Sequence, residues 1–340
     1  MNLVKNQVVT EDYAIYNADC MDVLAQLQEN SVDLVIYSPP FAGLYNYSSD
    51  DRDFSNCESK QQFLEQYDYL VAELARVTKK GRINAVHCTD MLEKDGEIWD
   101  FPSEIVKIHK KYGFKQKNRI TISKDPFKVR MRTMVKSLMH KMVVEDSTNC
   151  MTAMPDYMII FVKDGENEVP VTHPVGLKRY AGEEFINHRL LSEMKQTENG
   201  ETLALSIHGS YESLRAKFKH ETNPNNQLSY YIWRRYADSI WYDIDINNVL
   251  KFKDFNDEDD EKHVHPLQLD VIDRIVELYS NPNEVVLTPF AGVMSEVFSP
   301  VSMGRRAIGI ELKETYFKQG VENMKDAKKR FAEEEKTLFG

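Results

Sequence analysis

The residues best suited to chemistry form the tetrapeptide Ser38-Pro39-Pro40-Phe41. Proline has a fixed φ and no backbone N–H, so two prolines in succession leave carbonyl acceptors that point in set directions. The Ser38 hydroxyl and the Pro39 carbonyl could each accept a hydrogen bond from an exocyclic amino group, while Phe41 stacks on the ring that carries it. The tetrapeptide therefore predicts a site for a planar, amino-bearing ring. The alternative is a proline turn that only terminates a strand.

A second candidate site is the segment LTPFAGVMSE at residues 287–296. It follows an apolar run and precedes a helical pattern, so its small residues would let a nucleotide-like ligand approach the backbone at the start of a helix. Glu311 follows Gly292 by 19 residues, at the end of the next apolar run. There its carboxylate could accept hydrogen bonds from both ribose hydroxyls of an adenosine. The alternative is an ordinary β-α-β crossover with a surface glutamate.

Both candidate sites follow short apolar runs that are typical of buried strands. These runs alternate with helical patterns, which predicts an α/β fold built on a doubly wound, mostly parallel sheet. In such sheets ligands bind beyond the carboxyl ends of the strands, which is where both sites lie. The predicted strands are 32–37, 83–87, 157–162, 285–287 and 307–310, and the predicted helices are 61–78, 102–112, 264–280 and 312–335.

The regular pattern fades between residues 164 and 261, which contain an Asn-Pro-Asn-Asn sequence and an aromatic cluster at 230–242. A chain of 340 residues also exceeds the ~250–300 residues over which a single core keeps growing. We therefore predict a smaller lobe, 164–261, inserted between two halves of one α/β domain, 1–163 and 262–340. The aromatic side chains of the cluster could line a recognition surface, although the core of a small lobe is their more usual place.

The charge of the chain is unevenly distributed. Lys and Arg number 43 and Asp and Glu number 54, a net charge of −11 that argues against a nucleic-acid partner. Residues 104–141, however, contain twelve basic and two acidic residues, so this window carries +10 and the remainder carries −21. Because salt screens charges beyond about 8 Å, a local basic face can neutralise phosphates whatever the total charge. Within the window Lys124, Lys128, Arg130 and Arg132 predict a loop that grips phosphates; the alternative is a charged surface connection.

The sequence does not indicate a membrane protein, a secreted protein or a metal site. No apolar run approaches the roughly 18 residues of a membrane span, and residues 1–14 lack the pattern of a signal peptide, so we expect a cytoplasmic protein. The four cysteines are too widely spaced for a zinc knuckle or a disulfide framework, and we expect no metal. His87 and Cys88 end a predicted strand near the expected cleft, where we expect them to pack.

Taken together, these motifs resemble a known family. VDLVIYSPPF, preceded by NADCMDVL, together with VVLTPFAGVMSEVF and GRRAIGIEL, is similar to the DNA amino-methyltransferases, which use S-adenosylmethionine to methylate cytosine N4 or adenine N6. The catalytic tetrapeptide precedes the cofactor loop, as in the permuted β-type subgroup of bacteria and phages. The segment HVHPLQL at 263–269 is similar to the HPxQ segment that leads into that loop. The resemblance covers residues 12–165 and 262–325.

The resemblance implies a role for each matching residue. It places Ser38 to Phe41 at the target base, with Ser38 also beside the cofactor, and it puts Glu311 on the cofactor ribose. Further cofactor contacts are implied for Asp19, Cys20, Pro289, Phe290 and Gly292. The inserted lobe would recognise the target in double-stranded DNA, in the cytoplasm of a bacterium or a phage-infected host. A second copy of the chain and a cognate restriction nuclease are the other partners that such enzymes can have.

The resemblance leaves several alternatives open. Family loops commonly have Asp and a second Gly where this chain has Thr288 and Met294, and a Lys where it has Leu269. Ser before Pro-Pro favours cytosine N4 over adenine N6. Carbon-5 methylation of cytosine is disfavoured because none of the four cysteines follows a proline. An RNA or protein-amide methyltransferase and a catalytically silent DNA-binding relative are the remaining alternatives.

Overall fold

The computed structural model of the chain describes residues 4–40, 54–57, 59–93, 96–183, 194–198, 201–205, 211–252 and 266–332. Phe41 of the predicted tetrapeptide lies outside these residues, and so do His263 and His265. The side chain of Arg132 is likewise outside the description.

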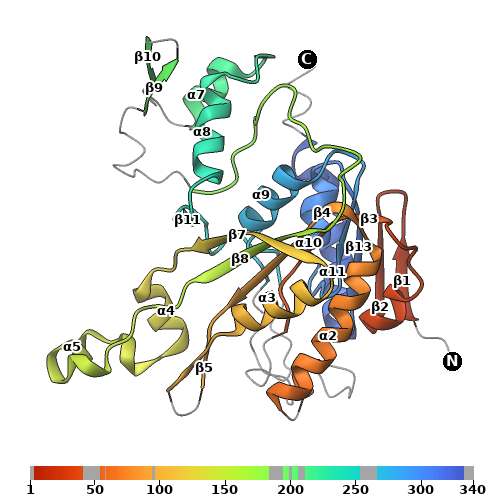
Figure 1. The fold of residues 1–340 in the computed structure, drawn as a ribbon, viewed down its shortest axis with the longest axis vertical. Helices are drawn as coiled ribbons and strands as arrows, with labels where there is room; N and C mark the ends of the chain where they lie inside the picture. The colour runs from red at the N-terminus through yellow and green to blue at the C-terminus, as the bar shows by residue number, and fades with distance from the viewer. Residues whose placement is uncertain are drawn as a thin grey trace.

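A nine-stranded sheet forms the centre of the described structure, in the order β1-β2-β13-β12-β3-β4-β8-β7-β11 (Figure 1). Strands β2, β13, β12, β3 and β4 run parallel, whereas β8 is antiparallel to both β4 and β7. The mostly parallel sheet confirms the predicted α/β fold. The strands are β1 (Val4–Val9), β2 (Tyr13–Ala18), β3 (Val32–Tyr37), β4 (Thr78–Thr89), β7 (Phe114–Ile122), β8 (Asp156–Lys163), β11 (Ile240–Trp241), β12 (Val285–Thr288) and β13 (Arg306–Glu311).

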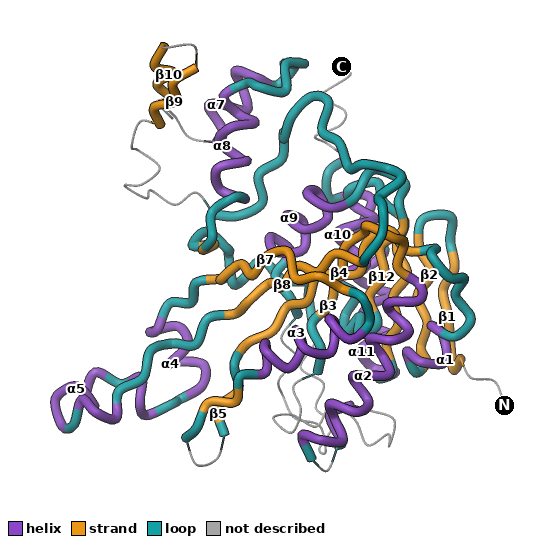
Figure 2. Tube along the Cα trace, viewed as in Figure 1, coloured by secondary structure: helices purple, strands orange, loops and turns teal. Residues whose placement is uncertain are grey.

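Helices cover both faces of this sheet (Figure 2). Strand β3 shows why both faces need a cover, because Leu34 and Ile36 point into one apolar cluster while Val35 and Tyr37 point into the other. A strand buried on both faces is expected to be an almost continuous apolar run. One face carries α1 (Cys20–Leu24), α2 (Lys60–Val77) and α3 (Phe101–Lys111), and the other carries α9 (Leu269–Tyr279), α10 (Ser295–Ser302) and α11 (Glu314–Met324).

Helix α2 shows how the sequence builds one of these covers. The Ser59 side chain accepts a hydrogen bond from the backbone N–H of Gln62 at 3.1 Å and so caps the first turn. Apolar residues then recur every three or four positions, which places them on one side of the helix. The buried side chains are Phe63, Tyr67, Leu70, Val71, Leu74 and Val77.

Several elements differ from the sequence predictions, and β1, β2, β11 and α1 were not predicted at all. Residues 124–133 were predicted as a loop, but α4 (Pro126–Thr133) is a helix. Asp125 caps it by accepting from Lys128 N at 2.9 Å, and proline is well suited to the first helical position. Helix α9 begins at Leu269 rather than 264, since a proline at 266 disfavours helical backbone before it. Strand β7 was missed because its central residues are polar and exposed.

The middle of the chain has an apolar core of its own. Helices α7 (Tyr211–Phe218) and α8 (Gln227–Tyr236) lie together at the upper left of Figure 1, near the hairpin of β9 (Met194–Glu198) and β10 (Glu201–Leu205). Of the aromatic cluster, Tyr236 and Trp241 are buried, whereas Trp233 is 46% exposed. Tyr236 packs in the core of this lobe, whereas Trp241 lies on β11 and packs in the core beneath the main sheet. The core of this lobe consists of Leu177, Tyr180, Leu214, Leu228, Tyr231, Ile232 and Tyr236.

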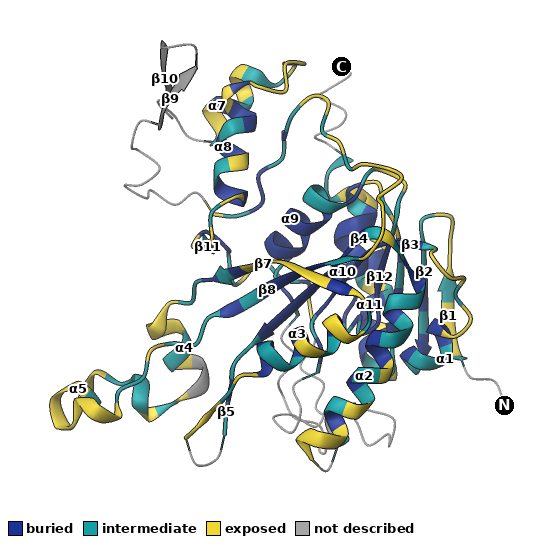
Figure 3. Cartoon of the chain, in the orientation of Figure 1, coloured by how far each residue is buried: buried dark blue, intermediate teal, exposed yellow. Residues whose placement is uncertain are grey.

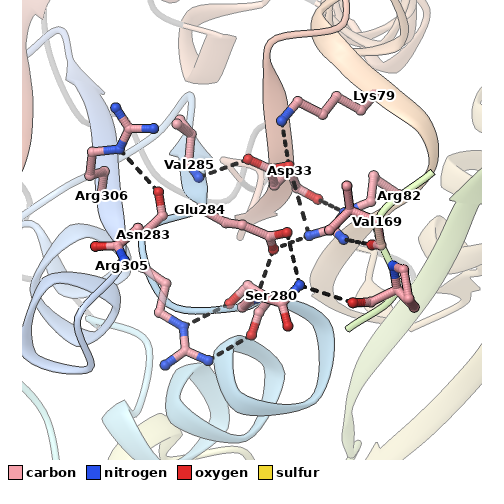
Figure 4. Close-up of polar contacts among 12 residues, drawn as sticks. Asp33, Lys79, Arg82, Val169, Ser280, Asn283, Glu284, Val285, Arg305 and Arg306 are labelled. Atoms are coloured by element: carbon pink, nitrogen blue, oxygen red, sulfur yellow. Dashed lines mark hydrogen bonds and ion pairs between the residues drawn. The ribbon is translucent and has the colours of Figure 1, made fainter. Parts of the chain in front are cut away.

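The amino-terminal edge of β3 and β12 is held by a polar network (Figure 4). Asp33 accepts hydrogen bonds from the Val285 N–H at 2.9 Å and from Lys79 Nζ at 2.6 Å. Arg82 donates to the Asp33 carbonyl at 3.1 Å and forms an ion pair with Glu284. The single acid in the apolar run of β3 thus joins three strands at this edge. This network leaves the opposite edge of the sheet, at the carboxyl ends of β3 and β12, free for the two candidate sites.

Several features relevant to function are absent from the described residues. None of the described helices combines the length and the apolar character needed to cross a membrane. Within the described ranges no group of three or more His, Cys, Asp or Glu side chains could hold a metal ion. The four cysteines, all of them described, form no disulfide bond.

Candidate active site

The two sequence motifs meet where the sheet is wound in both directions. Strands β3 and β12 are neighbours, with β4 beyond β3 on one side and β13 beyond β12 on the other. Because Val35 pairs with Leu287, the segments 38–40 and 289–290 leave the sheet side by side. The ring centroids of Tyr37 and Phe290 are 6.0 Å apart. Such a switch point is where open α/β sheets hold their ligands.

On the β3 side, Ser38 begins a row of four polar side chains. Its Oγ lies 3.3 Å from Nδ1 of His87 on β4. Nε2 of the same imidazole lies 3.4 Å from Oδ2 of Asp156 on β8. Lys124, just beyond β7, donates to the other carboxylate oxygen at 2.6 Å. The row therefore crosses four neighbouring strands at the carboxyl edge of the sheet, and it includes the half-buried serine of the predicted tetrapeptide.

The carboxylate in this row is ionised. Burial raises the pKa of Asp156, but the positive charge of Lys124 and the imidazole of His87 outweigh that effect and hold the pKa at about 2. Lys124 was predicted as a phosphate contact, and its ammonium is already engaged here, with its side chain 31% exposed. A phosphate contact from Lys124 remains a prediction.

Sequence reasoning missed His87 as a site residue and did not single out Asp156. His87 is 7% exposed, so it packs as expected, yet both ring nitrogens face polar partners. The sequence did contain a signal for a site at these two residues, since each is a polar side chain near the end of an otherwise apolar strand. Which of them would meet depended on the strand order, which the sequence does not state.

On the β12 side, the glycine turn and Glu311 are joined directly. The Gly292 N–H donates to Glu311 Oε2 at 2.8 Å, and the Lys313 N–H donates to Oε1 at 2.8 Å. Gly292 has a φ of 49°, and a Cβ built there would meet no atom within 4 Å. Open space therefore lies beside the backbone at this turn, next to a carboxylate that the turn itself holds in place.

Asp19 and Cys20 lie at the end of β2, next to the strand that carries Glu311. Asp19 accepts from the Met21 N–H at 2.9 Å and so caps α1. Burial raises the pKa of the Cys20 thiol well above its ordinary value, with a further contribution from Asp19. The thiol therefore stays protonated and serves as a small apolar wall rather than as a nucleophile.

Glu296, in the first turn of α10, was not singled out from the sequence. It is 5% exposed, and burial, with a further contribution from Glu311, raises its pKa to about 8. At neutral pH it is therefore mainly protonated and can donate a hydrogen bond.

Two buried hydroxyls border the glycine turn without a partner. Thr288 Oγ1 and Ser295 Oγ make no hydrogen bond within the described part of the chain. An unsatisfied buried polar group costs about 1–3 kcal/mol. A polar ligand at the turn would remove this cost.

The sequence pattern of a family described as DNA methylase, the N6/N4 methyltransferases, matches residues 32–322. The chain belongs to this family. The match includes β3, the middle lobe and the glycine turn at Gly292. It also includes the row of Ser38, His87, Asp156 and Lys124, which is called the row behind Ser38 below.

Several relatives of this methylase are known. A DNA adenine methyltransferase of Escherichia coli strain K12, YhdJ, is 22% identical over 339 residues, which cover 95% of this chain and 86% of the relative. A Thermus thermophilus protein assigned as a DNA modification methylase aligns with a TM-score of 0.55 and 20% identity over 96% of each chain. The cytosine-N4-specific PvuII DNA methyltransferase aligns with a TM-score of 0.52 and 12% identity over 96% of this chain and 95% of that one. These structural likenesses show a shared fold.

The methylase compensates for its departure from the resembled pattern at position 294. Met294 adopts the left-handed conformation, with φ 75° and ψ 28°, which costs a non-glycine residue about 1–2 kcal/mol. Its fully buried side chain lies against two glycines on other elements. A Cβ on Gly320 of α11 would lie 2.3 Å from Met294 Cγ, and a Cβ on Gly309 of β13 would lie 3.3 Å from its Sδ. The turn thus keeps the backbone shape of a glycine.

A basic arm leaves the sheet of the methylase next to the site. Directly after Lys124 the chain forms α4 and then α5 (His140–Glu145), which extend away from the sheet and are largely exposed (Figures 1 and 3). Lys128 and Arg130 lie on α4 and are flanked in sequence by two exposed apolar side chains, Phe127, 71% exposed, and Met131, 61% exposed. Three of the four residues predicted to bind DNA, Lys128, Arg130 and Arg132, therefore belong to the helix of this arm, whereas Lys124 lies in the row.

Proposed function

We propose that this DNA amino-methyltransferase modifies the exocyclic N4 of cytosine. The observation that carries the proposal is the placement of the Ser38 hydroxyl and the Pro39 carbonyl at the end of β3, beside the turn at Gly292. Two acceptors on one rigid segment match the two protons of an amino group. The serine before Pro-Pro favours cytosine, as the family resemblance implies.

The methyl donor of this family is S-adenosylmethionine. When bound it supplies a methyl group that is activated by attachment to a sulfonium. The residues present fit such a cofactor, because the backbone at Gly292 borders open space, and Thr288 and Ser295 offer unpaired hydroxyls. We assign the ribose to Glu311, and the remaining contacts to Asp19, Cys20, Ser38, Pro289, Phe290 and Gly292.

The chain itself contributes orientation and hydrogen-bond acceptors to the reaction. An exocyclic amine on a pyrimidine is a weak nucleophile because its lone pair is conjugated with the ring. Ser38 Oγ and the Pro39 carbonyl would hold its two protons and so favour a pyramidal nitrogen whose lone pair faces the methyl group. Fixed orientation and preorganised acceptors for the developing positive charge are large sources of rate.

The target nitrogen lies inside the duplex, so the base has to be flipped into the site at a cost of a few kcal/mol. We propose that Phe41 and Pro40 contact the flipped base, and that Lys128, Arg130 and Arg132 of the arm contact phosphates beside it. The arm is well placed for this role because it begins two residues after Lys124, whose ammonium belongs to the row behind Ser38.

Methyl transfer from labelled S-adenosylmethionine to duplex DNA tests the proposal. Ser38→Ala and Pro39→Ala should each lower the transfer rate by about 100-fold or more, the usual cost of removing one preorganised hydrogen-bonding group. Ser302→Ala, at the end of α10 and away from the site, is the matched control and should retain the wild-type rate. A Ser38→Ala protein that transfers methyl groups at the wild-type rate would contradict the assigned role of the hydroxyl.

The identity of the modified base separates the two leading candidates. Adenine N6 is the second candidate because the relative YhdJ is an adenine methyltransferase. Mass spectrometry of nucleosides from methylated DNA should show N4-methylcytosine. N6-methyladenine would overturn the cytosine assignment, and a chain that fails to bind S-adenosylmethionine in calorimetry would be a silent relative.

A further inference from the structure

The row behind Ser38 has a geometric origin. Near the carboxyl edge of the sheet, β3, β4, β8 and β7 each place a buried apolar side chain in the same apolar cluster. There the alternation places one polar residue on the same face of each strand, two positions beyond a buried apolar one. The pairs are Ile36 and Ser38, Ala85 and His87, Met158 and Asp156, and Ile122 and Lys124.

The contacts within the row define which nitrogen of His87 carries the proton. Its Nε2 is buried and makes no hydrogen bond within the described part of the chain, but Oδ2 of the ionised Asp156 carboxylate lies 3.4 Å from it. A carboxylate only accepts, so the neutral imidazole is stabilised with its proton on Nε2. Nδ1 then presents a lone pair to the Ser38 hydroxyl at 3.3 Å. The hydroxyl proton points to Nδ1, and the oxygen lone pairs remain for a target amine.

We propose that His87, held by Asp156 and Lys124, is a positioning residue that orients the Ser38 hydroxyl and takes up, through it, the proton released by the target amine. The proposal rests on the proposed function and adds a route for the proton. Lys124 keeps Asp156 ionised, and Asp156 keeps His87 in the tautomer that accepts at Nδ1. Lys124 thus gains a role beside the site that its sequence context, a basic window, did not suggest.

The proposed transfer moves one proton from the target nitrogen to His87 through the Ser38 hydroxyl. The target nitrogen bonds to the methyl carbon as the carbon–sulfur bond breaks, and the sulfur keeps the electron pair of that bond. The nitrogen then carries one proton in excess, which passes to Ser38 Oγ while the hydroxyl proton moves to His87 Nδ1. The resulting imidazolium faces the Asp156 carboxylate and later releases the proton to water.

Among the residues that the structure describes, few charged groups lie near His87. Asp156 and Lys124 face it within the row, with Ser38 on its other side. The charged residues on the opposite face of these strands are turned away from His87, and those of α9, which covers its face, are engaged elsewhere. They include Asp90 and Arg119, both against Tyr157, and the four charged residues of α9: Asp270 with Asn248, Asp273 with Arg330, Arg274 with Asp243 and Glu277 with Tyr236.

Single-turnover methyl transfer at saturating S-adenosylmethionine and DNA tests the role of His87. His87→Phe keeps a ring but no acceptor, and its rate should fall about 100-fold, within the usual contribution of a positioned proton acceptor. His87→Asn can still accept from Ser38 but cannot hold a proton, so its rate should lie between those of His87→Phe and the wild type. Dissociation constants for the cofactor should stay within about threefold of wild type, since the contribution is to orientation and proton uptake.

The matched control is His109→Phe, at a second buried histidine. His109 is stacked on Phe161 with ring centroids 4.0 Å apart and lies on the other face of the sheet, so this variant tests the loss of a buried imidazole outside the row. Its single-turnover rate should match the wild type. A His87→Phe rate within threefold of wild type overturns the proposal.

Nitrogen NMR of histidine-labelled protein provides a readout that needs no methyl transfer. The His87 ring should be the Nε2–H tautomer in the wild type and should lose that preference in Asp156→Asn. An Nδ1–H tautomer in the wild type overturns the proposal. A chain with no transferase activity but with the Nε2–H tautomer contradicts the proposed function and leaves the arrangement of the row intact.

Discussion

Replacing Gly320 by alanine should destabilise the protein only while Met294 is present. A Cβ at position 320 would lie 2.3 Å from Met294 Cγ, far inside van der Waals contact, and the methionine is fully buried. Overpacking of this kind costs about 1–3 kcal/mol. Position 320 is inside α11, where alanine is favoured over glycine by about 1 kcal/mol. The net loss should therefore lie between zero and about 2 kcal/mol.

In a Met294→Gly background the obstacle is gone, so Gly320→Ala should raise the free energy of unfolding by about 1 kcal/mol. Met294→Gly by itself should lower the free energy of unfolding by about 2–5 kcal/mol because a buried side chain is lost. It should regain about 1–2 kcal/mol because glycine adopts the left-handed backbone without strain. The coupling between the two substitutions should then be about 1–3 kcal/mol.

Urea unfolding of the wild type, the two single variants and the double variant, followed by circular dichroism, measures this coupling. If Gly320→Ala has the same effect in both backgrounds within about 0.5 kcal/mol, the packing argument is refuted. The left-handed methionine of the turn would then need another explanation.

Two further predictions concern charge. Glu296→Gln should stabilise the protein more at about pH 8 than at about pH 5. The pKa of Glu296 is about 8 in the folded state and 4.5 ordinarily, so the buried carboxyl group costs no stability below pH 4.5. As the pH rises from 4.5 to 8, the wild type loses stability because the unfolded chain can ionise this group and the folded protein cannot. The difference, about 2–4 kcal/mol, is measured by denaturant unfolding at both pH values, and an equal effect at both would contradict the buried, protonated state. Neutralising Lys128, Arg130 and Arg132 together should lower DNA affinity and reduce the slope of log affinity against log salt by about 2–3, in salt titrations of binding. Neutralising three exposed lysines between residues 318 and 329 is the control, and an unchanged slope for the arm variant would show that the DNA face lies elsewhere.

The chain also shows where sequence reasoning reaches its limit. The strand that ends in Ser38 and the turn at Gly292 were predictable because alternation, proline chemistry and glycine turns are local properties. The helix α4 was missed although its signal, Asp125 followed by Pro126, is equally local. His87 was expected to pack, and its packing is real, but its polar partners lie on other strands.

The sequence by itself determined the family, the order of the two motifs and the apolar runs that become the central strands, because each depends on residues close together in the chain. The tertiary structure decided which side chains meet. Asp156 reaches His87, 69 positions away in the chain, because β8 enters the sheet antiparallel beside β4. Met294 fits its turn because glycines 15 and 26 residues further along leave room for it. Such contacts depend on the order of the strands and on the space between neighbouring elements. Neither can be read from one short segment of the sequence, because each involves residues far apart in the chain.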